Sequence, residues 1–392
     1  MSDLLLDLEA VREELRRGQL DGWLVYDFKG GNPVFGDLLG AAPKTTRRVF
    51  LWIPAQGEPR LLAHSIDRSH LPSGLPATIY RDRHELQAKL GELLGKAKTV
   101  AMEYSPRCAL PTSSFTDAGT VELIRSFGVA VAPSADLYSI GRCRLTPSQL
   151  DGHLWASERL VATVKRAFEY AAERARSGLT EFQLAQWIRT ELESQGLVVE
   201  EGPIVAVNGH SGDPHYEPTE SASAPVRPGN WLLLDVWTRR SEPDAVYADV
   251  TWVGYLGEQA PVEHQQVFEA VVAARDAAVD YLRNAASRGE IPMGWQVDRV
   301  ARDLLAARGH GDRFTHRLGH SLGHDVHGRG ANLDDFETHD TRRLLPGTAF
   351  TVEPGVYRDD FGVRCEIDVV MSAEGPRVTT ESQREIIVIA PR

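Results

Sequence analysis

Two kinds of hydrophobic pattern alternate along the first 140 or so residues. Three short apolar runs are typical of buried strands, at residues 23–26, 49–53 and 99–102. Three other segments place apolar side chains at helical spacing, at residues 4–15 (Leu4, Leu8, Val11 and Leu15), 85–94 and 114–127. This mixed order predicts a small α/β domain. No cluster of chemically active residues converges in it, so we expect a supporting or access-limiting role.

Residues 145–149 indicate a domain boundary, because they combine the features of a strong helix start. Thr146 can cap the helix, Pro147 suits its first position, and Gln149 completes a capping box. Thr180 and Gln183 repeat this pattern before a second helix. We therefore expect an N-terminal domain at residues 1–145 and a second domain at residues 146–392.

The second domain repeats an order of two helices followed by strands. After the first helix pair, the pattern predicts strands near 203–207, 231–237 and 246–255. Helices near 262–286 and 295–308 follow, and then strands near 348–353, 363–370 and 385–390. This order suggests an internally duplicated unit in an α+β fold, although no repeat is detectable in the sequence itself.

Composition and charge narrow the class of protein. The net charge of −12 and the pI near 5.6, without a basic stripe, argue against a nucleic-acid partner. No apolar run approaches the length of about 20 residues needed to span a bilayer. The three cysteines show no paired spacing, and the chain starts with acidic residues where a signal peptide would be positive. We expect a cytoplasmic protein with reduced thiols and no membrane association.

Four carboxylates stand inside segments that otherwise resemble buried strands: Asp235, Asp249, Glu353 and Glu366. An ionised carboxylate in such a place costs several kcal/mol unless it is paired or binds a metal, so four of them need strong compensation. Two divalent cations supply four positive charges, and His320 would complete a shell of oxygen and nitrogen ligands. The sequence therefore predicts a dinuclear metal site.

Further polar residues surround these candidates. Residues 316–327 contain four histidines, and Gly319 and Gly323 favour a turn that leads into a strand over a helix. A second loop also carries a histidine, His215. Strand alternation would place Arg364 and Asp368 on the face of Glu366, and Thr251 on the face of Asp249, as supporting partners.

These residues carry a resemblance to the pita-bread metallopeptidases, the family of prolidase, aminopeptidase P, methionine aminopeptidase and creatinase. The chain is most similar to the bacterial Xaa-Pro dipeptidases of that family. The matching segments are Pro214-His215-Tyr216, Leu233-Leu234-Asp235, Asp249-Val250-Thr251, His316-x-x-Gly319-His320, Asp325-Val326-His327, the run 351–357 and Gly362-Val363-Arg364-x-Glu366. The resemblance implies a pseudo-duplicated, curved antiparallel sheet covered by helices, with a smaller N-terminal α/β domain.

The resemblance also implies a metal-binding role for five residues. Asp235 would chelate one metal, Asp249 and Glu366 would bridge both, and His320 and Glu353 would complete the second. The cofactor would be two divalent ions per subunit, Mn²⁺, Zn²⁺ or Co²⁺, and a hydroxide bridging the metals would attack the scissile carbonyl. Glu353 would assist proton transfer.

The remaining implied roles concern the substrate. His327 and His215 would contact the substrate carbonyl and the developing tetrahedral intermediate. His316 would line the pocket for a prolyl ring together with Tyr357, and Arg364 would support it. The implied function is hydrolysis of the Xaa-Pro bond in short peptides by a homodimer.

Three departures from the family pattern affect the pocket and leave every expected ligand in place. The two aspartates are separated by extra residues around 239–243, Val236-Trp237-Thr238 replaces a glycine-rich stretch, and His324 occupies a position that is normally apolar. A dipeptidase is favoured over an aminopeptidase P that acts on longer peptides. Arg47 or Arg48 could pair with a substrate carboxylate, although solvated charge is the simpler interpretation. A metal-free creatinase-like hydrolase or a non-catalytic binding protein would not need the complete ligand set.

Overall fold

A computed structural model describes residues 4–391, and the chain divides into two compact units, residues 1–143 and 144–392. The helices of unit 1 are α1 (Leu8–Arg17), α2 (Pro33–Leu39), α3 (Arg83–Leu94), α4 (Ala118–Ser126) and α5 (Ala135–Arg142). Its strands are β1 (Gly22–Phe28), β2 (Arg48–Pro54), β3 (Arg60–His64), β4 (Ala77–Tyr80), β5 (Thr99–Met102) and β6 (Ala130–Pro133). They form a six-stranded mixed sheet in the order β4-β3-β2-β1-β5-β6.

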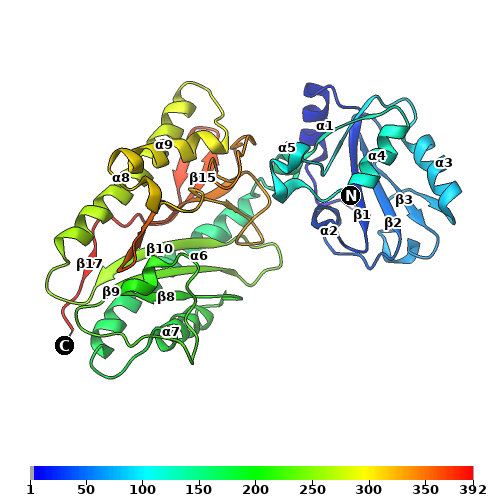
Figure 1. The fold of residues 1–392 in the computed structure, drawn as a ribbon. Coiled ribbons are helices and arrows are strands. Elements are labelled where there is room, and N and C mark those ends of the chain that lie inside the picture. The colour runs from blue at the N-terminus through cyan, green and yellow to red at the C-terminus, as the bar shows by residue number, and fades with distance from the viewer. Residues whose placement is uncertain (1–3, 392) are drawn as a thin grey trace. The chain divides into compact units, whose positions relative to one another are not determined.

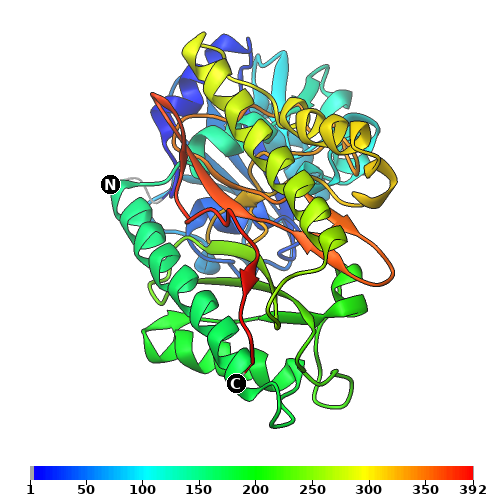
Figure 2. The ribbon, with the colours of Figure 1, turned by 90° about the vertical axis from the view of Figure 1, so that its left-hand side faces the viewer.

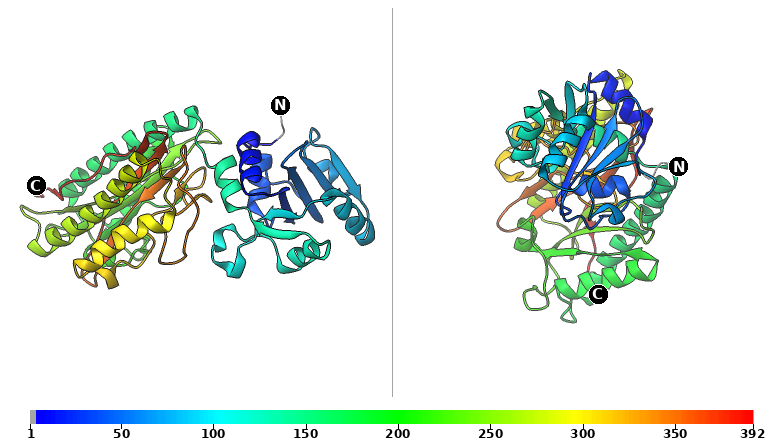
Figure 3. Two further views of the ribbon diagram at one scale, coloured as in Figure 1. Left: turned by 90° about the horizontal axis from the view of Figure 1, so that it is seen from above. Right: turned by 90° about the vertical axis from the view of Figure 1, so that its right-hand side faces the viewer.

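Side-chain alternation along the central strands of unit 1 divides its core into two layers. Trp23 and Val25 of β1 pack in the layer that contains α1, α2 and α5. Leu24 and Tyr26 pack in the opposite layer with α3 and α4. The sheet is therefore covered by helices on both faces, as Figures 1 and 3 show. The expected α/β layering follows directly from the period of two in the strand.

Two helices of unit 1 begin later than their apolar spacing predicts. The first begins at Leu8, because the Asp7 side chain accepts a hydrogen bond from the Ala10 amide and caps it there. The fourth begins at Ala118, where the Asp117 side chain accepts from the Thr120 amide. Capping thus outweighs apolar periodicity in setting where these helices start.

Unit 2 consists of two helix pairs and the strands that follow each pair. Its helices are α6 (Pro147–Arg174), α7 (Glu181–Ser194), α8 (Val262–Ser287) and α9 (Gly294–Ala307). The strands after the first pair are β7 (Leu197–Val198), β8 (Ile204–Val207), β9 (Trp231–Arg240) and β10 (Ala248–Tyr255). Those after the second are β11 (Ser321–Leu322), β12 (Ala349–Val352), β13 (Gly355–Tyr357), β14 (Gly362–Arg364), β15 (Ile367–Ser372), β16 (Gly375–Val378) and β17 (Ile387–Val388). Thr146 and Thr180 cap α6 and α7 with the predicted capping boxes.

The strands of unit 2 form one sheet for each helix pair and a small hairpin. The first sheet has the order β17-β10-β9-β7, with β8 also paired to β9, and the second has the order β11-β12-β15-β16. Pairing is antiparallel except between β10 and the C-terminal strand β17. Figure 2 shows β17, in red, between helices α6 and α8. The Glu366 amide donates to the Thr251 carbonyl at 3.1 Å, which links the two sheets.

Strand β9 shows how the fold positions the site. Its even-numbered residues 232, 234 and 236 pack against α6 and α7. On the opposite face, Trp231 and Leu233 enter the core around α8 and α9. Asp235 and Trp237 continue that second face, and in the antiparallel register they lie opposite Thr251 and Asp249 of β10. The side chains of Asp235 and Asp249 therefore lie on the face of the sheet that also carries the buried apolar residues Trp231 and Leu233.

None of the helices formed by residues 4–391 combines the length and apolar character required to cross a bilayer.

Candidate metal centre and substrate pocket

A cavity of about 950 Å³ lies in unit 2 and is lined by residues from both helix–strand halves. Every residue predicted for the site except Tyr357 lines it: His215, Asp235, Asp249, His316, His320, His327, Glu353, Arg364 and Glu366. Arg47 and Arg48 belong to unit 1 and are not among the lining residues. The structure thus gathers side chains that are separated by up to 151 positions in the sequence.

The five expected metal ligands come from five different elements. Asp235 lies on β9 and Asp249 on β10, while His320 precedes β11, Glu353 follows β12 and Glu366 connects β14 to β15. Ligand atoms of Asp249, His320 and Glu366 lie within 4.8 Å of one another. The Nε2 atom of His320 is 3.5 Å from Glu353 Oε1 and 3.7 Å from Asp249 Oδ2. Atoms at these separations can share one cation, because nitrogen and oxygen ligands bind zinc at about 2.0–2.2 Å.

The electrostatics of these acids indicate that a positive charge belongs among them. Burial and the neighbouring carboxylates raise the pKa of Asp249 and of Glu366 well above their ordinary values. Burial also raises the pKa of Glu353 to about 7, although Arg364 acts in the opposite direction. The Oδ1 atom of Asp249 is buried and has no hydrogen-bond partner among the described residues. This clustered, partly unsatisfied oxygen set fits a divalent cation.

His320 is held in the form that a metal requires. Its Nδ1 faces the Ser321 carbonyl at 3.3 Å, so Nδ1 carries the proton and Nε2 presents a lone pair to the acids. Burial, and then the neighbouring His327, hold the pKa of His320 well below its usual range. A neutral imidazole with one nitrogen fixed by a carbonyl is the usual arrangement of a histidine ligand.

A buried network connects Arg364 to two of the candidate ligands. Arg364 forms an ion pair with Asp235, and its Nε donates to Thr251 Oγ1 at 3.0 Å. The Thr251 hydroxyl in turn donates to Glu366 Oε2 at 2.7 Å. Thr251 therefore lies where strand alternation predicts and orients one oxygen of Glu366.

Asp368 does not share the environment that the sequence predicts for it. The chain changes sheets at Cys365, since β14 pairs with β13 and β15 pairs with β12. Asp368 lies behind Asp249, accepts its amide at 3.0 Å, and approaches His153 Nε2 at 3.9 Å. Its role is to fix the Asp249 backbone, and His153 is a buried support that the sequence analysis missed.

His316 and Tyr357 form a second series of hydrogen bonds, which ends at Arg364. The Nδ1 of His316 faces the Arg317 carbonyl at 2.7 Å and must donate to it, which leaves Nε2 as an acceptor. The Tyr357 hydroxyl donates to that Nε2 at 2.7 Å and accepts from Arg364 at 2.8 Å. Burial, and then Arg364, lower the pKa of His316 to about 3, so the imidazole is neutral. Tyr357 therefore orients His316 from behind the cavity wall.

The two remaining histidines lie at the exposed side of the cavity. The ring of His327 lies 4.5 Å from that of His320, at an angle of 68°. His215 is exposed on a loop that Glu181, a fully buried residue of α7, holds in place. Glu181 accepts hydrogen bonds from the Val207 and Ala224 amides, the Tyr216 hydroxyl and His210 Nδ1. The sequence analysis assigned neither Glu181 nor His210 to the site.

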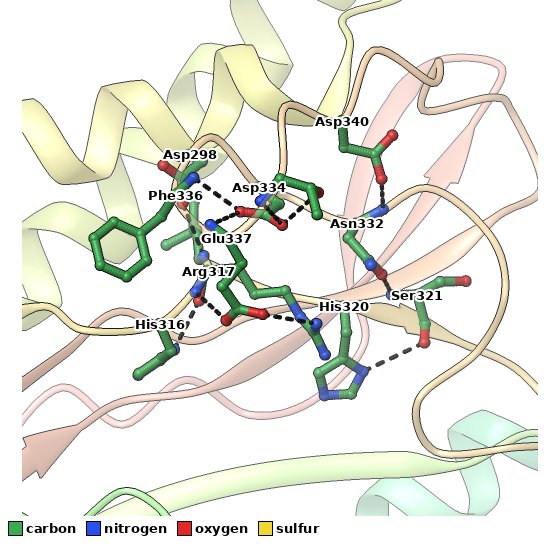
Figure 4. Close-up of polar contacts among 12 residues, drawn as sticks. Asp298, His316, Arg317, His320, Ser321, Asn332, Asp334, Phe336, Glu337 and Asp340 are labelled. Carbon is green, nitrogen blue, oxygen red and sulfur yellow. Dashed lines mark hydrogen bonds and ion pairs between the residues drawn. The ribbon is translucent and has the colours of Figure 1, made fainter. Parts of the chain in front are cut away.

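Several other lining residues were not assigned to the site from the sequence, among them Trp237, Arg317 and Glu337. Trp237 stands opposite Asp249 and packs against Gly202, where a Cβ atom would lie 2.6 Å from the indole. Arg317 and Glu337 form an ion pair at 3.5 Å beside His316 and His320, as Figure 4 shows. The position of Arg317 within the histidine-rich segment was the available signal for it. Glu337 is distant in sequence and gave none.

Comparison with known proteins places this geometry in context. The model of the Peptidase_M24 family, described as metallopeptidase family M24, matches residues 158–373. The chain is 28% identical over 237 residues to the putative dipeptidase YkvY of Bacillus subtilis, covering 59% of this chain and 61% of that protein. It is 28% identical over 229 residues to an Xaa-Pro dipeptidase of Lactobacillus helveticus, covering 58% of each. The matched regions thus span less than two thirds of these relatives.

Solved structures share the fold over almost the whole chain. Dipeptidase PepE from Mycobacterium ulcerans superimposes with a TM-score of 0.73 at 23% identity and covers 98% of this chain and 97% of its own. X-Pro aminopeptidases also share the fold. The predicted α+β pita-bread fold with its smaller N-terminal domain is confirmed.

Proposed function

Because the chain belongs to metallopeptidase family M24, we propose that it hydrolyses the Xaa-Pro bond of dipeptides with the help of two divalent metal ions. The observation that carries this proposal is the convergence of four carboxylates and one neutral imidazole on a single cavity. The relatives named as dipeptidases support the substrate class. Aminopeptidase P activity on longer peptides is the alternative, because X-Pro aminopeptidases share the fold.

In this proposal, Asp235, Asp249, His320, Glu353 and Glu366 hold the ions. Bound divalent cations would lower the pKa of water and polarise the scissile carbonyl. Glu353 is suited to take up and return a proton at its carboxylate, because it lines the cavity together with the other ligands and can lie within reach of the attacking water.

The surrounding residues bind and orient the substrate in this proposal. His327 and His215 direct N–H groups at the carbonyl oxygen, where negative charge develops. His316 and Arg364 are fixed by Tyr357, so the wall that would face a prolyl ring is rigid before substrate arrives. Arg364 also forms an ion pair with Asp235 and so balances the charge of one of the clustered acids.

Peptide hydrolysis by chelated and metal-restored protein tests this function. The chelated protein is supplied with Mn²⁺, Zn²⁺ or Co²⁺ and assayed on Ala-Pro, Ala-Pro-Ala and Ala-Ala. We expect metal-dependent cleavage of Ala-Pro, slower cleavage of Ala-Pro-Ala, and little cleavage of Ala-Ala. Equal rates on Ala-Pro and Ala-Pro-Ala would favour the aminopeptidase alternative, and activity that survives chelation would refute the metal-dependent mechanism.

The metal content and the assembly state are separate parts of the proposal. Elemental analysis should find about two divalent ions per chain, as two metals are needed to compensate four acids. His320→Ala should lower that number, because it removes the one nitrogen ligand. Light scattering on the metal-loaded protein would test the proposed homodimer.

A further inference from the structure

Two of the departures from the family pattern lie together beside the cavity. Trp237, which replaces part of a glycine-rich stretch, lines the cavity and stands opposite Asp249. Arg239, from the extra residues between the two aspartates, pairs with Glu200 at 2.6 Å, and Glu200 also lines the cavity. Residues that distinguish this chain from the family pattern are therefore gathered on one part of the cavity wall.

The indole of Trp237 forms a fixed surface on this part of the wall. A Cβ atom added at Gly202 would lie 2.6 Å from Cη2 of the indole, so the edge of the ring rests directly on the backbone of residue 202. Arg189 holds that backbone by donating to the carbonyls of Val199 and Gly202. The Trp237 side chain is only partly buried, and it presents an apolar aromatic surface to the cavity.

The position of the ligand cluster decides which part of a substrate meets this surface. In the proposed function the scissile carbonyl lies at the cluster and the prolyl ring faces His316 and Arg364. The residue before proline extends from the carbonyl in the other direction, towards Trp237 and the lining residues between 200 and 217. The cavity volume of about 950 Å³ leaves room there for a long side chain.

Carboxylates flank the indole on the same side of the cavity. Glu200, Glu201 and Glu217 are exposed lining residues. Glu200 is engaged, because it pairs with Arg239 and accepts a hydrogen bond from the Tyr247 hydroxyl at 2.9 Å. Among the described residues, the carboxylates of Glu201 and Glu217 have no hydrogen-bond or ion-pair partner. Both are therefore available to a ligand.

The charge of this wall favours a cation. Arg239 balances Glu200, and Arg189 balances at most one of the other two acids while its terminal nitrogens donate to backbone carbonyls. One negative charge remains uncompensated beside an aromatic ring. A positively charged side chain is attracted by both features, whereas an acidic one would be repelled.

We propose that Trp237 and Glu201 form the subsite for the side chain of the residue before proline and select a basic residue, lysine or arginine. This inference rests on the proposed Xaa-Pro dipeptidase function and specifies its substrate class. The apolar stem of the basic side chain lies along the indole, and its cationic end reaches Glu201. Glu201 is suited to this role because it directly precedes Gly202, on which the indole rests.

Two dipeptides that differ in one charge test the inference on the metal-loaded, full-length protein. Lys-Pro and norleucyl-proline (Nle-Pro) share the scissile bond, the α-amino group and a four-carbon stem, but Nle-Pro lacks the side-chain ammonium. We expect wild type to prefer Lys-Pro by about 5- to 30-fold in kcat/KM, mainly through KM, which is the size of one exposed ion pair together with one cation–π contact. Glu201→Gln should bring this ratio close to one. Trp237→Leu retains an apolar wall and should lower the ratio by a smaller factor.

The control variant is Glu258→Gln, which changes an exposed carboxylate outside the cavity, beyond the end of β10 that is distant from Asp249. It should leave the ratio at the wild-type value. The inference is overturned if wild type cleaves Nle-Pro as well as Lys-Pro, or if Glu201→Gln slows both dipeptides by the same factor. If Trp237→Leu does not fold, the wild-type ratio and Glu201→Gln still decide.

Failure of this inference can be distinguished from failure of the proposed function. Metal-dependent cleavage of Ala-Pro without a preference for Lys-Pro over Nle-Pro overturns the basic subsite alone. If wild type cleaves none of the three dipeptides with any metal, the proposed function itself fails.

Discussion

Glu353 should make the metal-free protein less stable as the pH rises. Burial raises the pKa of its carboxyl group from 4.5 to about 7 in the folded chain. Between these values the folded chain retains a proton that the unfolded chain has lost, so stability falls with increasing pH. The stabilising contribution is complete below pH 4.5 and is lost as the pH passes 7. An acid whose pKa is lowered on folding has the opposite effect, because its contribution to stability is lost as the pH falls.

The magnitude follows from the size of the shift. A shift of about 2.5 pKa units corresponds to about 3 kcal/mol at 1.36 kcal/mol per unit. Less than a third of this is already lost at pH 5, which leaves about 2–3 kcal/mol to be lost between pH 5 and pH 8. Glu353→Gln cannot ionise and should not show this loss. The difference in unfolding free energy between variant and wild type cancels the titration of all groups that do not interact with Glu353.

Denaturant unfolding with excess chelator, at pH 5 and pH 8, measures this difference. The stability of Glu353→Gln relative to wild type should increase by about 2–3 kcal/mol from the lower to the higher pH. With saturating Mn²⁺ the order should reverse, because a ligand that binds only the folded state stabilises wild type more than a variant with a weakened site. A relative stability that is the same at both pH values would refute the electrostatic reasoning for this carboxyl group.

Three further predictions concern the supports of the site. Thr251→Val removes the hydroxyl between Arg364 and Glu366 and should weaken metal binding by about 10- to 100-fold, whereas Thr251→Ser should retain it; metal titration measures both. Metal binding should release protons near neutral pH, since the raised pKa values leave these acids partly protonated; calorimetry in buffers of different ionisation enthalpy measures the number. Glu181→Gln should destabilise the fold by about 1–3 kcal/mol and raise KM more than it lowers kcat, because each carboxylate oxygen accepts at least two hydrogen bonds around the His215 loop and an NH₂ group accepts none; unchanged kinetics would contradict this.

Much of the fold could be predicted because strand and helix periods are visible in the apolar residues. The capping boxes at Thr146 and Thr180 also placed two helix starts. The break at Cys365 was not predictable, because the apolar pattern continues through it while the pairing partners change. Pairing partners depend on tertiary structure, and no local pattern encodes them. The face assigned to Asp368 was wrong for this reason.

The candidate site was accessible to sequence reasoning where it depends on buried charge. An acid inside an apolar run is conspicuous, and all four acids line the cavity. Residues that act through contacts with distant parts of the sequence cannot be identified from a local pattern. Glu337 reaches Arg317 across 20 positions, and His153 reaches Thr379 across 226. Trp237 was conspicuous only as a departure from the family pattern, and its position opposite Asp249 required the strand register.

The charge balance of the cavity connects the metal proposal to the substrate proposal. The four carboxylates carry four negative charges when ionised, and the buried Arg364 compensates one of them. One divalent cation would still leave the cluster negative, and a peptide carboxylate would be repelled from it. Two divalent cations would change the net charge from minus three to plus one. A doubly loaded site would therefore attract an anionic substrate and stabilise developing oxygen charge. Selectivity for Ala-Pro over its amide, Ala-Pro-NH₂, should consequently weaken at low metal occupancy.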